Sequence, residues 1–163
     1  MGRHLPLDLF LLEEKMVVES DGLLDESSLA AAPLPQEAVC VRLDVPRADD
    51  LADLVFLANN KLVAANLATM PYPFSVNDGR AMIAKAGVHH HGNAMFAIRL
   101  KSTGRLIGIA RYAKMEAGGP VHVGYWLGEP FWGQGLATEA VHSLVDHAFT
   151  YHDIDELQGS CRG

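Results

Sequence analysis

The sequence lacks the cysteine spacing, the basic clusters and the long apolar runs that mark three common classes of protein. Its two cysteines, Cys40 and Cys161, lie far apart and form no Cys-x-x-Cys motif, so neither a zinc site nor a redox pair is expected. The formal net charge is −7, and without a basic block the chain is not expected to bind nucleic acid, because neutralising phosphates requires clustered Lys and Arg. No run approaches the ~20 apolar residues of a membrane-spanning helix.

The sequence is expected to form one domain with a sizeable core, and the protein is expected to be cytoplasmic. A length of 163 residues can bury such a core. Two free thiols suit a reducing cytoplasm, and Cys40, within an apolar strand-like run, is expected to be inert core. The apolar start is interrupted by Asp8 and makes a poor signal peptide. The acidic balance would attract basic partners such as amines or cationic peptide ends.

The chain divides into an N-terminal extension and linker, residues 1–37, and a domain, residues 38–163. The extension ends in an alanine run followed by two prolines, which is typical of a linker. Within it, residues 7–18 could form a short helix or strand. Whether this segment packs on the domain or stays free is left open by the sequence.

The domain alternates strand and helix patterns in the order strand, two helices, three strands, glycine turn, helix, strand. Alternation and turn residues predict the strands, and a 3.6-residue apolar period predicts the helices, with Ser75 as one N-cap. The three consecutive strands predict an antiparallel meander. The expected strands are 38–43, 95–100, 106–112, 121–127 and 156–161; the expected helices are 48–65, 76–86 and 135–150.

The glycine-containing turn before the last helix has the strongest functional signal. Gly133 and Gly135 remove side chains where the turn tightens, so backbone N–H groups can point at an anion, and the helix dipole favours a phosphate there. A P-loop is excluded because no Lys and Ser or Thr follow Gly135. A dinucleotide fingerprint is a weak match, because Thr138 takes its third glycine position, although Asp153 and Asp155 stand at a plausible distance.

The run from Gly124 to Ala140, GYWLGEPFWGQGLATEA, closely resembles the GNAT N-acetyltransferases. The resemblance is to the branch that includes the ribosomal-protein N-terminal acetyltransferases (RimJ/RimL-like). The family's pyrophosphate loop is roughly Arg/Gln-x-x-Gly-x-Gly/Ala; Trp132 takes its first position, where this branch commonly has an aromatic residue. The resemblance implies the GNAT fold, an α/β (α+β) arrangement with a mixed, mostly antiparallel sheet flanked by helices.

The same resemblance implies acetyl-CoA as co-substrate, no metal, and a primary amine as acceptor, either a small molecule or a protein N-terminus. The pyrophosphate would sit on the turn, and the pantetheine arm would pair with the preceding strand almost as an extra strand. The amine would attack the thioester directly, without a covalent enzyme intermediate. The implied cofactor-binding residues are Trp126, Leu127, Gly128, Trp132, Gly133, Gln134, Gly135, Leu136, Ala137 and Thr138.

The general base is a separate question. Family members often place a Glu on the strand before the turn, and alignment puts His122 in that slot. Histidine has a suitable pKa for a base near neutrality; the alternative is that His122 is an exposed strand residue and water takes the proton. Arg111 and Tyr112 are candidates for the acceptor cleft.

Several other polar residues have simpler interpretations. His89, His90 and His91 are expected to form a solvated loop near the acceptor entrance, because the side chains of adjacent residues point apart and do not converge on a metal. Glu129 and Glu139 are expected to be surface charges.

Family members usually continue beyond the last strand with a helix and two more strands. The edge of the strand that starts at Glu156 is then expected to be open, and open edges promote self-pairing. We expect the N-terminal extension or a second chain, as a homodimer, to cover it; a shortened form with impaired activity is the third possibility. The absent elements also motivate an alternative function, a non-catalytic acyl-CoA-binding or oligomerisation module.

Overall fold

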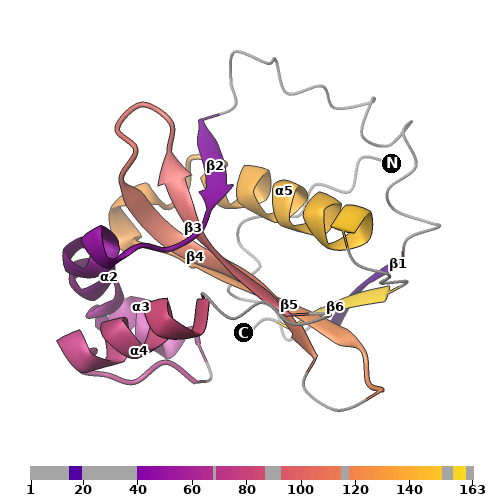
Figure 1. Cartoon of the computed structure of the whole chain (residues 1–163), viewed down its shortest axis with the longest axis horizontal. Helices are drawn as coiled ribbons and strands as arrows, with labels where there is room; N and C mark the ends of the chain where they lie inside the picture. Colours follow the sequence, from indigo (N-terminus) through magenta and orange to yellow (C-terminus); the bar gives the residue numbers. More distant parts are fainter. Residues whose placement is uncertain are drawn as a thin grey trace.

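The computed structural model describes residues 15–19, 40–67, 69–86, 93–114, 118–151 and 156–160. Six strands in this part of the chain form one sheet in the order β1-β6-β5-β4-β3-β2 (Figure 1). Every neighbouring pair is antiparallel except β5 and β6, which run parallel. The strands are β1 Lys15–Glu19, β2 Val41–Asp44, β3 Ala94–Leu100, β4 Leu106–Lys114, β5 Val121–Leu127 and β6 Glu156–Ser160. The expected mixed, mostly antiparallel sheet and its meander are confirmed.

The helices are interrupted more often than the apolar period predicted. They are the 3-10 turns η3 Ala48–Asp50 and η4 Glu129–Phe131 and the α-helices α2 Leu51–Ala58, α3 Lys61–Ala65, α4 Val76–Ala86 and α5 Leu136–Tyr151. The single helix predicted over 48–65 is wrong. Asn60 is extended, and its side-chain oxygen accepts the N–H groups of Leu62 and Val63, so it starts a new helix instead of continuing the old one.

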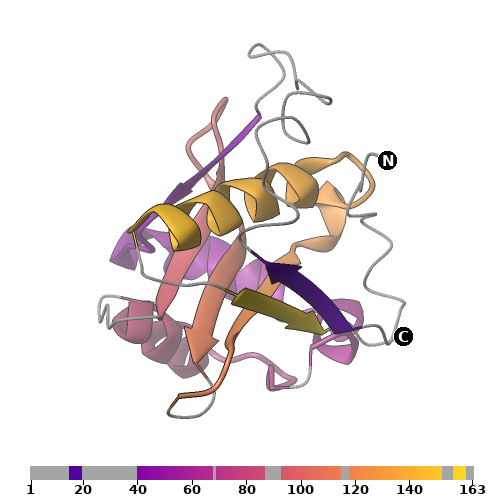
Figure 2. The same cartoon turned by 90° about the vertical axis from the view of Figure 1, so that its right-hand side faces the viewer.

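Two apolar cores lie on opposite faces of the sheet. On one face α5 buries Ala140, Leu144, Val145 and Ala148 against the sheet, as its period predicted. On the other face α2 and α4 cover the neighbouring strands, with Leu54 among the fully buried residues. Figure 2 shows α5 crossing one face and the α2–α4 group on the other. The sheet is therefore a central layer with a helical layer on each side.

The outer edge of β6 is covered by a strand from the predicted N-terminal extension. β1 pairs antiparallel with β6 from Lys15↔Ser160 to Glu19↔Glu156, and the two strands lie side by side in Figure 2. Pairing satisfies the N–H and C=O groups that an edge would expose. The expectation that the extension covers this edge is confirmed for β1, and the boundary at residue 37 stays a prediction.

Cys40 and the first domain strand differ from expectation. β2 begins at Val41 and not at residue 38 among the described residues, and Cys40, just before it, is exposed and not part of the core. A helix long and apolar enough to cross a membrane is absent from the part of the chain that the structure describes.

Candidate active site

The turn before α5 has the backbone conformation that its glycines imply. Gly133 and Gly135 have φ angles of +74° and +78°, which non-glycine residues rarely adopt. A Cβ atom at either position would meet no other atom within 4 Å, so the glycines answer a backbone requirement and the space before the turn is open. The 16-residue helix α5 begins directly after Gly135. Open space and a helix N-terminus together suit a phosphate.

Next to this turn the sheet opens between β5 and β6. The parallel register covers only Val121↔Leu157, His122↔Gln158 and Val123↔Gly159. β4, on the other side, stays paired with β5 as far as Leu127. Among the described residues, no strand pairs with the last four residues of β5 on the β6 side. An extended ligand could therefore add there as a short strand, using main-chain hydrogen bonds.

The end of β5 presents its backbone to this opening at alternate residues. The Gly128 N–H donates to the Ile107 carbonyl on the β4 side, at 2.8 Å. The backbone N–H and C=O groups of successive strand residues point to opposite sides of the strand. Those of Leu127 therefore face the opening, whereas those of Trp126 face β4. Of the three strand residues proposed to line the pantetheine arm, Leu127 is thus the one whose backbone is correctly directed.

Trp132 links the strand to the turn. Its indole N–H donates to the Leu127 carbonyl at 2.7 Å, and its half-buried ring packs against both cores. This contact holds the end of β5 against the turn that follows it. A bracing role for Trp132 is therefore visible in the structure, while its expected contact with the cofactor stays a prediction.

Most of the other predicted cofactor residues can offer only main-chain atoms. The side chains of Trp126, Leu127, Leu136 and Ala137 are buried in the cores. Gly128 lies where a Cβ atom would come within 2.5 Å of the Leu57 side chain, so its lack of a side chain allows α2 to approach β5. A ligand at the turn would meet backbone N–H groups, as the sequence implied.

Two residues of the turn have side chains near its surface. Gln134 is exposed, and its amide nitrogen donates to the Pro130 carbonyl at 3.2 Å. Thr138 is half-buried in the first turn of α5. Their expected contacts with the cofactor stay predictions.

His122 lies on the sheet face that α2 and α4 cover in part. It is half-buried, and its strand partners are Ala113 on β4 and Gln158 on β6. Trp126, two alternations further along β5, belongs to the core under α2, so period-two geometry puts His122 on that same face. The imidazole thus stands near the point where β6 leaves β5.

Tyr112 does not line a cleft, and this expectation is wrong. Its ring is fully buried on the α5 side, and its hydroxyl lies 3.0 Å from His147 Nδ1. Burial raises the pKa of Tyr112 to about 12. Arg111, the adjacent residue, points to the opposite face by strand alternation and is exposed.

Glu139 is not a surface charge of the expected kind. Its half-buried carboxylate accepts the N–H groups of Cys40, at 2.8 Å, and Val41, at 3.2 Å. It thereby joins the first turns of α5 to the start of β2, across 98 residues of sequence for Val41. The sequence carries no local signal for this contact. Glu129 is exposed as expected and accepts a hydrogen bond from the Asn60 amide.

Two predicted features lie outside the described residues: the histidine loop with His89, His90 and His91, and the second cysteine, Cys161. Within the described ranges, no group of three His, Cys, Asp or Glu side chains is placed to hold a metal ion.

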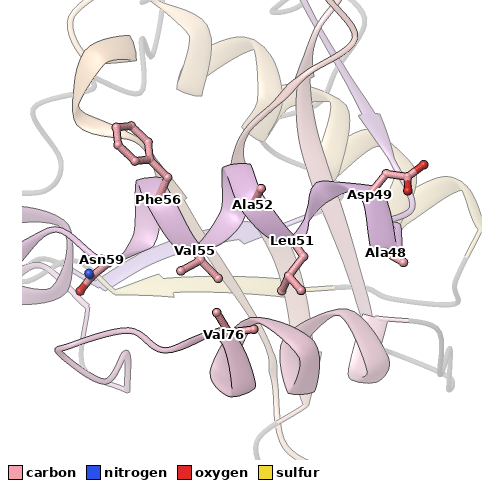
Figure 3. A pocket seen from close by; sticks show the side chains of 8 residues that line it. All are labelled: Ala48, Asp49, Leu51, Ala52, Val55, Phe56, Asn59 and Val76. Carbon is pink, nitrogen blue, oxygen red and sulfur yellow. The ribbon is translucent and has the colours of Figure 1, made fainter.

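A separate groove lies between α2 and the start of α4 (Figure 3). Figure 3 shows Leu51 and Val55 directed toward Val76, with Phe56 pointing away from them. The lining includes no residue of β5 or of the glycine turn; it is Ala48, Asp49, Leu51, Ala52, Val55, Phe56, Asn59 and Val76. The groove is thus distinct from the candidate site.

The chain is similar to known acetyltransferases. A model described as an acetyltransferase (GNAT) domain matches residues 41–162. An uncharacterized N-acetyltransferase, p20 of Bacillus licheniformis, is 34% identical over 64 residues, which are 39% of this chain and 36% of that protein. The match thus spans little more than a third of that relative's length.

Solved structures share the fold. RimL, a ribosomal L7/L12 alpha-N-protein acetyltransferase solved with coenzyme A, has a TM-score of 0.64 and 23% identity, over 76% of this chain and 71% of that one. MccE, a microcin C7 self-immunity acetyltransferase solved with acetyl-CoA and AMP, gives 0.56 and 19%, over 69% and 64%. Spermidine N-acetyltransferase from Vibrio cholerae, solved with CoA and spermine, gives 0.55 and 18%, over 68% and 64%.

The family model covers β2 to β6, and so includes the opening between β5 and β6, the glycine turn and α5. Most of the chain, and the whole of the candidate site, fall within the match. The chain therefore belongs to the GNAT acetyltransferase family of enzymes.

Proposed function

We propose that the protein transfers the acetyl group of acetyl-CoA to a primary amine, with protein N-terminal amines among the candidate acceptors. The observation that supports this most directly is the combination of two features at one place. β5 and β6 separate after Val123↔Gly159, and the turn with Gly133 and Gly135 at positive φ stands at the end of the same β5.

The donor would bind in two parts. Its pyrophosphate would accept hydrogen bonds from N–H groups between Trp132 and Thr138, where the dipole of α5 favours negative charge. Its peptide-like arm would lie in the opening beside β5 and accept a hydrogen bond from the N–H of Leu127, whose carbonyl accepts the Trp132 indole N–H. Backbone contacts at both ends would fix the thioester without any charged side chain from the turn.

The reaction needs one proton transfer at the acceptor and one at the leaving group. The amine nitrogen bonds to the thioester carbon, the carbon–sulfur bond breaks, and CoA leaves as a thiolate that takes up a proton. The acceptor nitrogen loses a proton, and His122 is the residue that we assign as its base. Main-chain N–H groups of β5 would stabilise the oxyanion that forms on the carbonyl.

Family relatives act on different amines, so the acceptor is the finer part of the proposal. One relative is a ribosomal-protein N-terminal acetyltransferase and another is a spermidine acetyltransferase. Assignment to the RimJ/RimL-like branch rests on the run from Gly124 to Ala140. A cytoplasmic location goes with this assignment.

The test combines turnover with binding. Release of free thiol from acetyl-CoA is measured with a panel of small amines, polyamines and peptides, and CoA binding is measured by calorimetry on the same protein. Turnover with at least one amine is expected. CoA binding without turnover across the panel would favour the alternative, a non-catalytic acyl-CoA-binding or oligomerisation module; absence of CoA binding would contradict both.

A further inference from the structure

Arg111 and His122 lie on one face of the sheet at the place where it opens. Arg111 pairs with Gly124 across β4 and β5, and Ala113 pairs with His122. Arg111 and His122 are therefore diagonal neighbours on the same face, and such positions are about 7–8 Å apart. A guanidinium on a long side chain can reach a group bound close to His122.

Gly124 leaves room above the strand between these two residues. Its φ is not in the left-handed region, and a Cβ atom would meet only the Arg111 side chain, at an ordinary 3.6 Å from Nε. Neither backbone strain nor a steric clash therefore requires a glycine here. The missing side chain leaves this part of the face to the Arg111 side chain, which lies over Gly124 on β5.

Arg111 is a cation without a carboxylate partner in the described part of the chain. Two neighbours of Arg111 on the same face of the sheet carry no charge: Met95, its partner on β3, and Ala113, two residues further along β4. The carboxylate described on the same face of β6, Glu156, lies two residues from the position that pairs with His122 and accepts a hydrogen bond from Gln158. Among the described residues of these strands, the charge facing an acceptor between Arg111 and His122 is therefore positive.

We propose that Arg111 binds a carboxylate that the acceptor carries a few bonds from its amine, and that this selects amino-acid-like or acidic amines over polyamines. The inference rests on the proposed acetyl transfer. Guanidinium binds carboxylate in a two-pronged geometry, whereas a second ammonium on a polyamine would be repelled. Arg111 thus acts against the overall negative charge of the protein, which by itself favours cationic acceptors.

The test uses acceptors that share an amine and differ in charge. One set is butylamine, 4-aminobutyrate and 1,4-diaminobutane; the other is three peptides with N-terminal serine followed by glutamate, glutamine or lysine. The expected result is a kcat/KM roughly three- to tenfold higher for the carboxylate-bearing member than for the neutral one. The first set tests a small-molecule source of the carboxylate, and the second a peptide source.

Charge reversal then locates the effect. Arg111→Glu should reverse the order within each responsive set, chiefly through KM for the acceptor, while CoA affinity stays unchanged. Arg111→Lys should keep the order with a smaller ratio. Lys101→Glu is the matched control, because it makes the same change of charge in the exposed β3–β4 turn and should leave the order unchanged.

The outcomes separate the two proposals. Turnover with no preference for carboxylates, or a preference that survives Arg111→Glu, would overturn the role of Arg111 and leave acetyl transfer intact. If Lys101→Glu abolished the carboxylate preference to the same extent, the preference would come from the net charge of the protein, and this too would overturn the role of Arg111. No turnover with any member of either set would overturn acetyl transfer to these amines and the inference with it.

Discussion

At the scale of single residues, the turn before α5 concentrates its function in backbone conformation. Gly133 and Gly135 are required by their positive φ angles and not by packing, because a Cβ atom at either position would contact no neighbour. The sequence motif could therefore be interpreted correctly without knowledge of packing. Gly128 is different, because only the approach of Leu57 makes a side chain there costly.

Gly135→Ala is expected to weaken CoA binding. A left-handed conformation costs an alanine roughly 1 kcal/mol, and relaxation toward negative φ would turn the N–H groups away from the phosphate. Calorimetry should show a Kd for CoA raised by roughly tenfold, which is about 1.4 kcal/mol for the strain and the lost hydrogen bonds together. Gly118→Ala is the matched control, with φ of +76° and the same open surroundings in the β4–β5 turn. Equal loss of CoA affinity in both variants would contradict the phosphate role.

His122→Ala is expected to lower kcat/KM at neutral pH by on the order of a hundredfold, the usual contribution of a general base. The difference should narrow at alkaline pH, where the free amine already predominates. Thiol release measured across pH, with CoA affinity as the check on folding, tests this. An unchanged kcat/KM at neutral pH would remove His122 from the mechanism and leave proton transfer to water.

At the scale of elements, a buried ion pair fixes η3 against the β3 strand. The Arg99 guanidinium donates to both Asp50 carboxylate oxygens at 2.6 Å, and Asp50 and Arg99 are only 6% and 2% exposed. Burial raises the pKa of Asp50, but hydrogen bonds from Arg99 and the Arg47 N–H outweigh it and hold that pKa below its usual value. Arg99 also donates from Nε to the Asp44 carboxylate, at 3.1 Å, so loss of the Asp50 charge would leave the buried guanidinium with one carboxylate partner.

Asp50→Asn is therefore expected to reduce the free energy of unfolding by about 1–3 kcal/mol, measured by urea denaturation. Because the folded pKa is lowered, the wild-type pair stabilises above the unfolded pKa of about 3.9 and loses this contribution as pH falls through the folded value. Acid should thus narrow the gap between wild type and variant.

Asp53→Asn provides the comparison for this pair. Asp53 bonds Arg105, whose side chain is 69% exposed, so the loss should stay below about 1 kcal/mol. Similar losses in the two variants would show that burial of the Asp50 pair does not matter.

The helix break is the element-scale error of sequence interpretation. Apolar residues from 48 to 65 keep a helical period, so the period alone did not predict the break between α2 and α3 at Asn59 and Asn60. Asn60 caps α3, and Asn59 accepts the N–H of Phe74 from a loop 15 residues away. The break thus combines a local cap at Asn60 with a tertiary contact at Asn59, and the apolar period contains neither.

At the scale of the whole molecule, the N-terminal segment belongs to the sheet. β1 and β2 are consecutive strands in the sequence, but they form opposite edges of the sheet. β1 is the outermost strand beside β6, and β6 in turn borders the opening at β5. Loss of β1 would therefore affect both an edge and the element next to the candidate site.

Deletion of residues 1–19 is expected to lower stability and to promote self-association, because the β6 edge would then be open. Light scattering after size exclusion measures the association, and thermal unfolding measures the stability. Deletion of residues 1–14 is the control, since it keeps β1. A monomer of unchanged stability after the longer deletion would show that β1 does not protect this edge.

The sequence by itself determined the meander, the glycine turn and the helix after it, because φ > 0 at glycine, strand alternation and helical period are local properties. It also implied the family through one contiguous run. Only the tertiary structure decided that β1 covers β6, that Glu139 bonds the start of β2, that Tyr112 is buried, and that Arg111 faces His122. These depend on which strands become neighbours and on which face each residue lies, and a one-residue change of register would move every side chain of a strand to its other face.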